Sequence, residues 1–288
     1  MKQFILVLPL SMTIACTPPP EAPDDLEALF EYIFTHITDE DPEALQAGLT
    51  NLDLWLNEGD NLSSTIEGYQ VQNLKDESVA GLDDKERKIE ESLVGAAVGH
   101  SYDHEMNELL NTMFVEDWSR VSNGTYSCYE RIYDDNASPN CLLDNSCEQI
   151  SYQTTSVSSW AGVVTVVSEN SGQVRLVETE YGTAVVQRTW LNEPADTSGL
   201  LGDLVDVKAQ YYVNITAPTS NGSILRTTAT WIDGEYGIDD EDFAKNQMIK
   251  TMQDQNTILT DWIDGEQDNE ASCLCSNYDY DEKECLSE

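Results

Sequence analysis

Cysteine is the residue type whose spacing says most about the chemistry of this chain. Seven cysteines occur in three places: Cys16 near the start, a middle group of Cys128, Cys141 and Cys147, and a late group of Cys273, Cys275 and Cys285. Neither group contains the C-x-x-C spacing of zinc folds, and no histidine lies near either one. Without Cys16 the remaining six make an even set, so we expect disulfides in an oxidising compartment.

Disulfides within each group cannot pair all three of its cysteines. If all six cysteines are bridged, an odd number of bridges must join the groups. A disulfide between the near neighbours Cys273 and Cys275 would close a strained ring. We therefore expect Cys285 to pair with one of these two cysteines, and the other one to form a disulfide with the middle group. The acidic tail 265–288 is then stapled to the strand and loop at 128–147, although its polarity would prevent it from folding alone.

Cys16 ends an apolar leader. Lys2 is its positive end, Phe4 to Leu10 is apolar, and small residues follow, which predicts an export signal over residues 1–15. The tetrapeptide Thr13-Ile14-Ala15-Cys16 resembles the lipobox of bacterial membrane lipoproteins, with Thr13 where leucine is usual. The resemblance implies cleavage before Cys16 and acylation of its thiol as a membrane anchor. The alternative is an ordinary secretory signal that leaves Cys16 for a disulfide.

Histidine and serine offer little catalytic chemistry here. His100-Ser101-Tyr102-Asp103-His104 resembles the inverted zinc-protease motif H-x-x-E-H, whose imidazoles must share one helix. Two glycines before it and a capping signal at Ser101 place the helix start after His100, so we expect no metal there. No G-x-S-x-G nucleophile motif occurs.

The acidic runs 233–242 and 264–270 both begin within a WIDGE pentapeptide, and neither fits a calcium-binding loop. The hypothesis of a carboxylate pair for glycoside hydrolysis stays open, because the 54 acidic residues give too many candidate pairs to choose from. We therefore predict no catalytic, cofactor or metal residue, and a protein that is not an enzyme.

Charge excludes one class of partner. The chain has 14 basic and 54 acidic residues and a net charge of −40, which repels phosphate backbones and argues against nucleic-acid binding. A proline-rich tether over residues 16–23 should be extended and hold this acidic body away from a bilayer.

Helical patterns occupy residues 24–120. Asp24 and Asp25 open a first helix, a second begins near Asp41-Pro42, and a third spans Asp103 to Phe114. The polar residues 57–91, between the second and the third helix, are predicted to form a loop with one strand around residues 69–74.

Residues 121–264 change to a period of two, which predicts an antiparallel sheet of about seven strands. Along Val205 to Thr216 the apolar residues alternate with polar ones, and the strand pairs with Ile224 to Ile232. A second hairpin is predicted to turn at Asn170-Ser171-Gly172.

A long helix from Asp240 to Asp264, ended by Gly265, is predicted to cover the sheet. Its stripe of Met248, Met252, Leu259 and Trp262 should pack on the apolar face that carries Val207, Tyr211 and Val213. The fold class is therefore α+β: a helical region, then an antiparallel sheet covered by the C-terminal helix. This order of elements resembles the helix-grip arrangement of START-type proteins, which implies a ligand cavity between sheet and helix.

Two function hypotheses stay open. The first is a non-enzymatic binding or structural lipoprotein of the bacterial cell envelope, anchored in the membrane and facing the periplasm or the exterior. The second is a carrier of an apolar ligand in a helix-grip cavity. A cavity of at least ~300 Å³ would favour the carrier, and a tightly packed interface would favour the first hypothesis.

Replacing the anchor residue tests the leader. We expect wild-type protein in the membrane fraction of its host, because several acyl chains hold firmly where one binds marginally. Cys16→Ser should move the protein to the soluble fraction. A Cys16→Ser protein that is processed normally and stays on the membrane contradicts the assignment.

Overall fold

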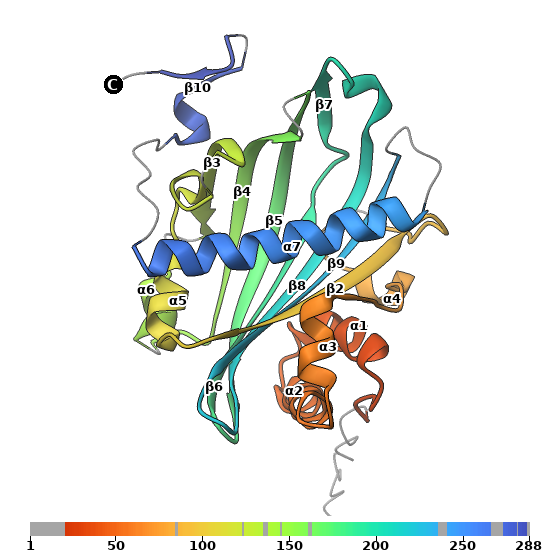
Figure 1. Cartoon of the computed structure of the whole chain (residues 1–288), viewed down its shortest axis with the longest axis vertical. Coiled ribbons are helices and arrows are strands. Elements are labelled where there is room, and N and C mark those ends of the chain that lie inside the picture. The colour runs from red at the N-terminus through yellow and green to blue at the C-terminus, as the bar shows by residue number, and fades with distance from the viewer. Residues whose placement is uncertain are drawn as a thin grey trace, which may run out of the picture.

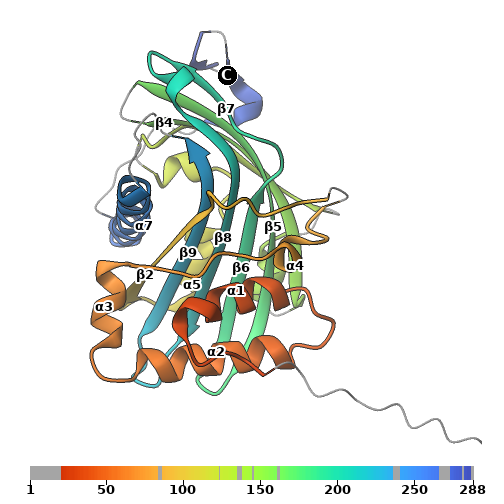
Figure 2. The same cartoon turned by 90° about the vertical axis from the view of Figure 1, so that its right-hand side faces the viewer.

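The computed structural model describes residues 21–83, 86–122, 124–134, 138–144, 146–160, 163–235, 241–265, 273–280 and 282–286. The chain is an α+β protein in which helices lie on both faces of one large antiparallel sheet (Figures 1 and 2). The predicted leader, Cys16 and most of the tether lie outside the described residues. No helix in the described part is long and apolar enough to cross a membrane.

The large sheet has nine described strands in the order β1-β2-β9-β8-β6-β5-β4-β3, with β7 paired to β5. Its strands are β1 (Tyr69–Gln70), β2 (Val94–Tyr102), β3 (Tyr126–Tyr133), β4 (Gln149–Trp160), β5 (Val164–Thr179), β6 (Gly182–Leu191), β7 (Asp196–Gly199), β8 (Asp206–Pro218) and β9 (Ile224–Glu235). A separate two-stranded ladder in the tail joins β10 (Tyr278–Asp279) to β11 (Glu284–Cys285).

The described helices divide between the two faces of the sheet. They are α1 (Leu26–His36), α2 (Glu43–Leu56), α3 (Asn61–Glu67), α4 (Asp76–Val79), α5 (Met106–Met113), α6 (Asn140–Leu143) and α7 (Glu241–Ile263), with short 3-10 turns at Trp118–Arg120, Gly202–Leu204 and Cys275–Asn277. In Figure 2, α1 and α2 lie on one side of the sheet and α7 on the other.

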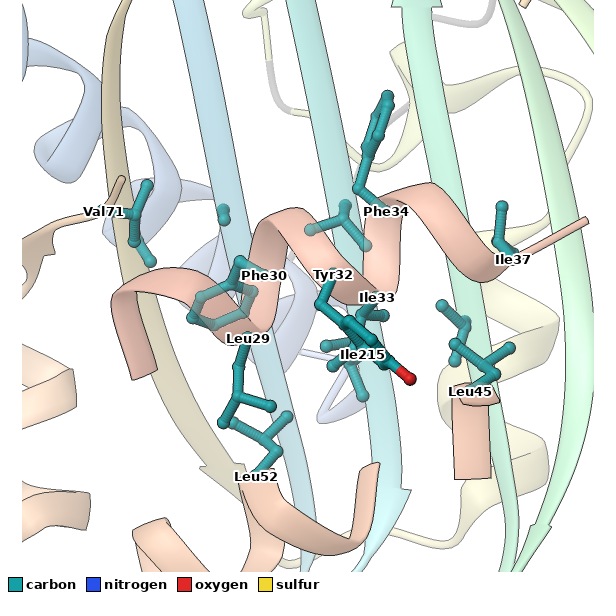
Figure 3. Close-up of a cluster of buried hydrophobic side chains, with 14 of the residues drawn as sticks. Leu29, Phe30, Tyr32, Ile33, Phe34, Ile37, Leu45, Leu52, Val71 and Ile215 are labelled. Atoms are coloured by element: carbon teal, nitrogen blue, oxygen red, sulfur yellow. The ribbon is translucent and has the colours of Figure 1, made fainter. Parts of the chain in front are cut away.

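The helices α1 and α2 cover the apolar face of the sheet. The carboxylate of Asp25 accepts a hydrogen bond from the backbone of Glu27 and so caps α1, as the sequence predicts. Figure 3 shows buried side chains of α1, Phe34 among them, beside the strands of the sheet. Phe34 meets Tyr211 and Trp231 edge to face, with ring centroids 6.1 and 5.8 Å apart. Such pairs add to the stabilisation from burial alone.

Two arginines from the sheet fix the end of α1. Arg188 donates to the Phe34 carbonyl at 3.0 Å, and Arg175 donates to the Ile37 carbonyl at 3.1 Å and to the Asp39 carbonyl. Burial lowers the pKa of Arg188 to about 10, so its guanidinium is still charged at neutral pH. Both cations therefore lie at the negative end of the helix dipole.

The structure corrects two boundaries. Residues 94–102, assigned above to the helical region, form β2, which pairs with β9 along its whole length, so residue 120 does not separate two units. The Asn170-Ser171-Gly172 segment is not a turn, because β5 runs through it as one strand.

The face covered by α7 also differs from the prediction. A register shift between Val207 and Ala209 reverses the alternation, so Tyr211 and Val213 face α1 and α2 instead of α7. Met248, Met252 and Leu259 are buried as predicted, but against β2 and α5, while Trp262 is only partly buried. Gly265 ends the helix at a φ of 72°, which favours glycine.

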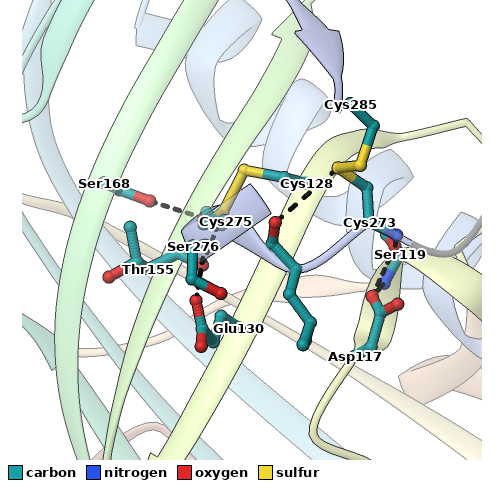
Figure 4. The surroundings of a disulfide bond; sticks show 12 residues. Asp117, Ser119, Cys128, Glu130, Thr155, Ser168, Cys273, Cys275, Ser276 and Cys285 are labelled. Atoms are coloured by element: carbon teal, nitrogen blue, oxygen red, sulfur yellow. Dashed lines mark hydrogen bonds between the residues drawn. A yellow bond between two sulfur atoms is a disulfide. The ribbon is translucent and has the colours of Figure 1, made fainter. Parts of the chain in front are cut away.

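Three disulfides connect the six cysteines of the two groups. Cys128 pairs with Cys275, Cys273 with Cys285, and Cys141 with Cys147, so one bridge crosses between the groups (Figure 4). The tail also donates and accepts hydrogen bonds at β3, where the Tyr129 amide donates to the Cys273 carbonyl at 3.0 Å.

Removing the crossing bridge should destabilise the fold more than removing the local one. Cys128 and Cys275 are 147 residues apart, and Cys141 and Cys147 are 6 apart. The chain-entropy model gives about 5 kcal/mol for the first loop and about 2 kcal/mol for the second. We expect that order for Cys128→Ala/Cys275→Ala and Cys141→Ala/Cys147→Ala in urea unfolding. Equal losses would contradict it.

Candidate functional site

A cavity of about 400 Å³ lies between α7 and the sheet face opposite α1 and α2. Its walls come from β3, β4, β5, β6, β8, β9 and α7, elements that are far apart in the sequence. Its volume exceeds the ~300 Å³ that separates the two function hypotheses. The helix-grip arrangement expected from the order of elements therefore contains a cavity of ligand size.

The packed contacts of α7 lie on one side of the cavity, with β2 and α5. Met248 and Met252 pack on Ala96 and Val98 of β2, and Leu259 packs with residues of α5. In Figure 1, α7 crosses in front of the sheet as one long helix. The central strands under it carry side chains that line the cavity.

The floor of the cavity is polar. Successive strands place hydroxyl and amide side chains there, among them Thr154, Ser156, Ser168, Gln187, Thr189 and Asn214. The roof is more apolar: α7 contributes Phe243, Ala244, Met248 and Met252, together with Gln247 and Gln255. A molecule that fills this space meets hydrogen-bonding groups on one side and methionine and aromatic groups on the other.

Tyr152 and Gly172 shape the floor. The Tyr152 ring occupies the space above Gly172 of the neighbouring strand, where an added Cβ would overlap the ring. Its hydroxyl lies 2.7 Å from the Thr189 hydroxyl and accepts a hydrogen bond from Gln187. Gly172 is therefore a close-approach position, which explains a glycine inside a strand.

Arg131 closes one end of the cavity. Its guanidinium donates to the Met113 carbonyl at 2.7 Å and to the Tyr129 hydroxyl at 2.9 Å, and it lies 4.9 Å from the centre of the Tyr152 ring. These contacts join β3 to the C-terminal end of α5. Its Nε is buried and has no partner within the described chain.

Arg226 lies on β9, across the floor from Arg131. It donates to the side-chain oxygens of Asn256 on α7 and Asn214 on β8, the latter at 3.0 Å. Tyr102 also donates to the Asn256 oxygen, at 3.1 Å. The nearby His100 has a lowered pKa, first because it is partly buried and second because Arg226 is close. Arg226 thus supplies a guanidinium to this corner of the cavity.

The candidate chemistry read from the sequence falls mostly outside this cavity. His100 lies in β2, and His104 lies between β2 and α5, so the two histidines do not share a helix. No group of three His, Cys, Asp or Glu side chains suited to a metal ion occurs among the described residues. The six bridged cysteines lie in the tail and around β3 and α6. Sequence reasoning named none of the cavity arginines.

No protein-family model matches the sequence, and no curated protein matches it. Solved structures match it in fold. A STAR-related lipid transfer protein from Xanthomonas axonopodis is 10% identical with a TM-score of 0.40, over 62% of this chain and 97% of that chain. A START superfamily protein from Mycobacterium smegmatis is 8% identical with a TM-score of 0.38, over 60% and 99%.

The lipid transfer and protein localization domain of human StarD13 (DLC2) is 12% identical with a TM-score of 0.36, over 59% of this chain and 75% of that chain. These TM-scores lie below 0.5 and the identities at 12% or below. The function is therefore argued from the cavity of this chain.

Substituting Gly172 tests the close packing of the floor. We expect Gly172→Ala to lower the free energy of unfolding by about 1–3 kcal/mol, because the added methyl group forces the Tyr152 ring to move. Tyr152→Leu should remove most of that loss when the two changes are combined, as a double-mutant cycle measures. Ser171→Ala, one position earlier on β5, is the control. Strictly additive losses would show that the contact does not constrain the floor.

Proposed function

We propose that this protein is a carrier that holds one small amphipathic organic molecule between α7 and the polar face of its sheet. The observation that carries the proposal is the cavity of about 400 Å³. Ligand pockets in proteins span ~300–1,000 Å³ and combine apolar walls with a few polar groups that orient the ligand.

The side chains of the floor support a ligand more than they support a core. A space left over in a packed core is lined by apolar groups, whereas this one combines apolar side chains with hydroxyl, amide and guanidinium groups. Buried polar groups are normally paired, yet Asn170 Oδ1 and the Nε atoms of Arg131 and Arg226 have no partner within the described chain. The polar face of the sheet is thus less completely paired within the described chain than a packed core.

The lining also refines the ligand class. Several floor groups pair with one another, as Ser156 does with Ser168 at 2.9 Å and Tyr152 with Thr189 at 2.7 Å. An entirely apolar molecule would still remove their remaining hydrogen-bonding capacity from water without replacing it, which costs free energy. A molecule with an apolar side toward Met248 and Met252 and polar groups toward the floor fits both walls. We therefore propose an amphipathic ligand in place of a purely apolar one.

We further propose that the carrier is exported and held at the bacterial membrane through Cys16, as a non-enzymatic lipoprotein. The lipobox-like leader and the three disulfides support this location, since disulfides persist in oxidising compartments. An anchored carrier would receive or deliver its ligand close to the membrane surface.

Filling the cavity from the helix side tests the carrier proposal. Ala244 lines the cavity, whereas Lys250 on the same helix is exposed. We expect the fluorescent probe N-phenylnaphthylamine to bind wild-type protein and Lys250→Trp alike, and Ala244→Trp at least about 10-fold more weakly, because the indole occupies the ligand volume. Undiminished binding to Ala244→Trp would contradict a site under α7. Native mass spectrometry of protein from its own host should show a retained small molecule.

A further inference from the structure

Arg226 differs from the other buried arginines of the described chain in what its guanidinium contacts. Arg175 and Arg188 donate to carbonyls at the end of α1, and Arg131 donates to a carbonyl at the end of α5. A helix C-terminus carries a partial negative charge, so these three cations have electrostatic partners. The guanidinium of Arg226 instead meets neutral side-chain oxygens, those of Asn256 and Asn214 and the Tyr102 hydroxyl.

The charge of Arg226 is buried without a carboxylate. Its residue is 9% exposed, and the described ion pairs of lysine and arginine involve Lys75, Arg87, Lys88, Lys208 and Lys245 instead. A buried cation normally needs an anion or a dense set of acceptors to offset its lost hydration. In a chain with 54 acidic residues, the lack of a carboxylate here is a specific feature of the site.

Two N–H donors at this corner also lack acceptors. Arg226 Nε is buried and unpartnered within the described chain, and so is Asn256 Nδ2. Asn256 is 1% exposed and already uses its oxygen to accept from Arg226 and Tyr102. Arg226 lines the cavity, so a charged oxygen placed there lies close to its guanidinium.

We propose that the ligand is an organic anion whose charged oxygens bind Arg226, while its apolar body lies under α7. This inference rests on the carrier proposal and adds the charge of the ligand to it. Carboxylate, sulfonate and phosphate groups all have oxygens that accept hydrogen bonds from a guanidinium. The planar guanidinium of arginine has a geometry suited to such oxygens.

Two fluorescent probes with the same aromatic body separate the two proposals. Anilinonaphthalene sulfonate carries an anionic group, and N-phenylnaphthylamine lacks it. We expect wild-type protein to bind the sulfonate more tightly than the neutral probe, despite the net charge of −40 that repels anions. Ala244→Trp should weaken both probes, which locates both in the cavity.

Arg226→Met should lower the affinity for the sulfonate probe by roughly 10- to 100-fold, because hydrogen bonds to a charged group are lost. It should change the affinity for the neutral probe by less than about 2-fold. Arg226→Lys should restore part of the sulfonate affinity. Lys208→Met, which removes an exposed cation, is the control and should change neither probe.

The outcomes distinguish the proposals. Sulfonate affinity that is unchanged in Arg226→Met, or a wild-type preference for the neutral probe, overturns the anion inference and leaves the carrier proposal standing. Loss of both probes in Arg226→Met and Arg226→Lys alike assigns Arg226 a structural role and also overturns the inference. Failure of wild-type protein to bind either probe overturns both proposals.

Discussion

The alternation of side chains along the antiparallel strands is the constraint on which this structure depends. Successive residues of β8 point to opposite faces, so Tyr211 and Val213 lie on one face and Tyr212 and Asn214 on the other. The apolar face is packed by α1 and α2. On the opposite, more polar face, α7 packs on β2, next to the short edge strand β1, and on α5, and the cavity lies over the central strands. The cavity thus belongs to one face of the sheet.

The tail completes the opposite edge of the sheet. β3 is the last strand in the order and would expose unpaired backbone groups, which favour aggregation. The Cys128–Cys275 bridge brings the tail to this edge, where Cys273 accepts from the Tyr129 amide and the Ser276 amide donates to the Glu130 carboxylate at 2.7 Å. The described part of the tail, residues 273–280 and 282–286, is thus held by covalent bonds against the strand that carries Arg131.

The sequence predicts those parts of the fold that local signals determine. The starts of α1 and α2, the end of α7 at Gly265 and a bridge between the cysteine groups follow from caps, glycine and parity. β2 was missed because its alanine and glycine residues show no alternation when both faces are covered. The prediction of which β8 residues face α7 was wrong, because a one-residue register shift leaves no clear signal in the sequence. Arg226 could not be singled out, since its missing carboxylate is a property of the assembled site.

The placement of charge explains how an acidic protein can offer a site for an anion. The long-range repulsion from its surface is screened beyond ~8 Å at physiological salt. A direct contact with a cation about 4 Å away in a partly buried site gains on the order of 4 kcal/mol at an effective dielectric constant of 20. The local attraction therefore outweighs the distant repulsion once the ligand lies under α7. At the surface the same acids oppose loose binding of anions, so only a molecule that also fills the cavity gains enough to stay.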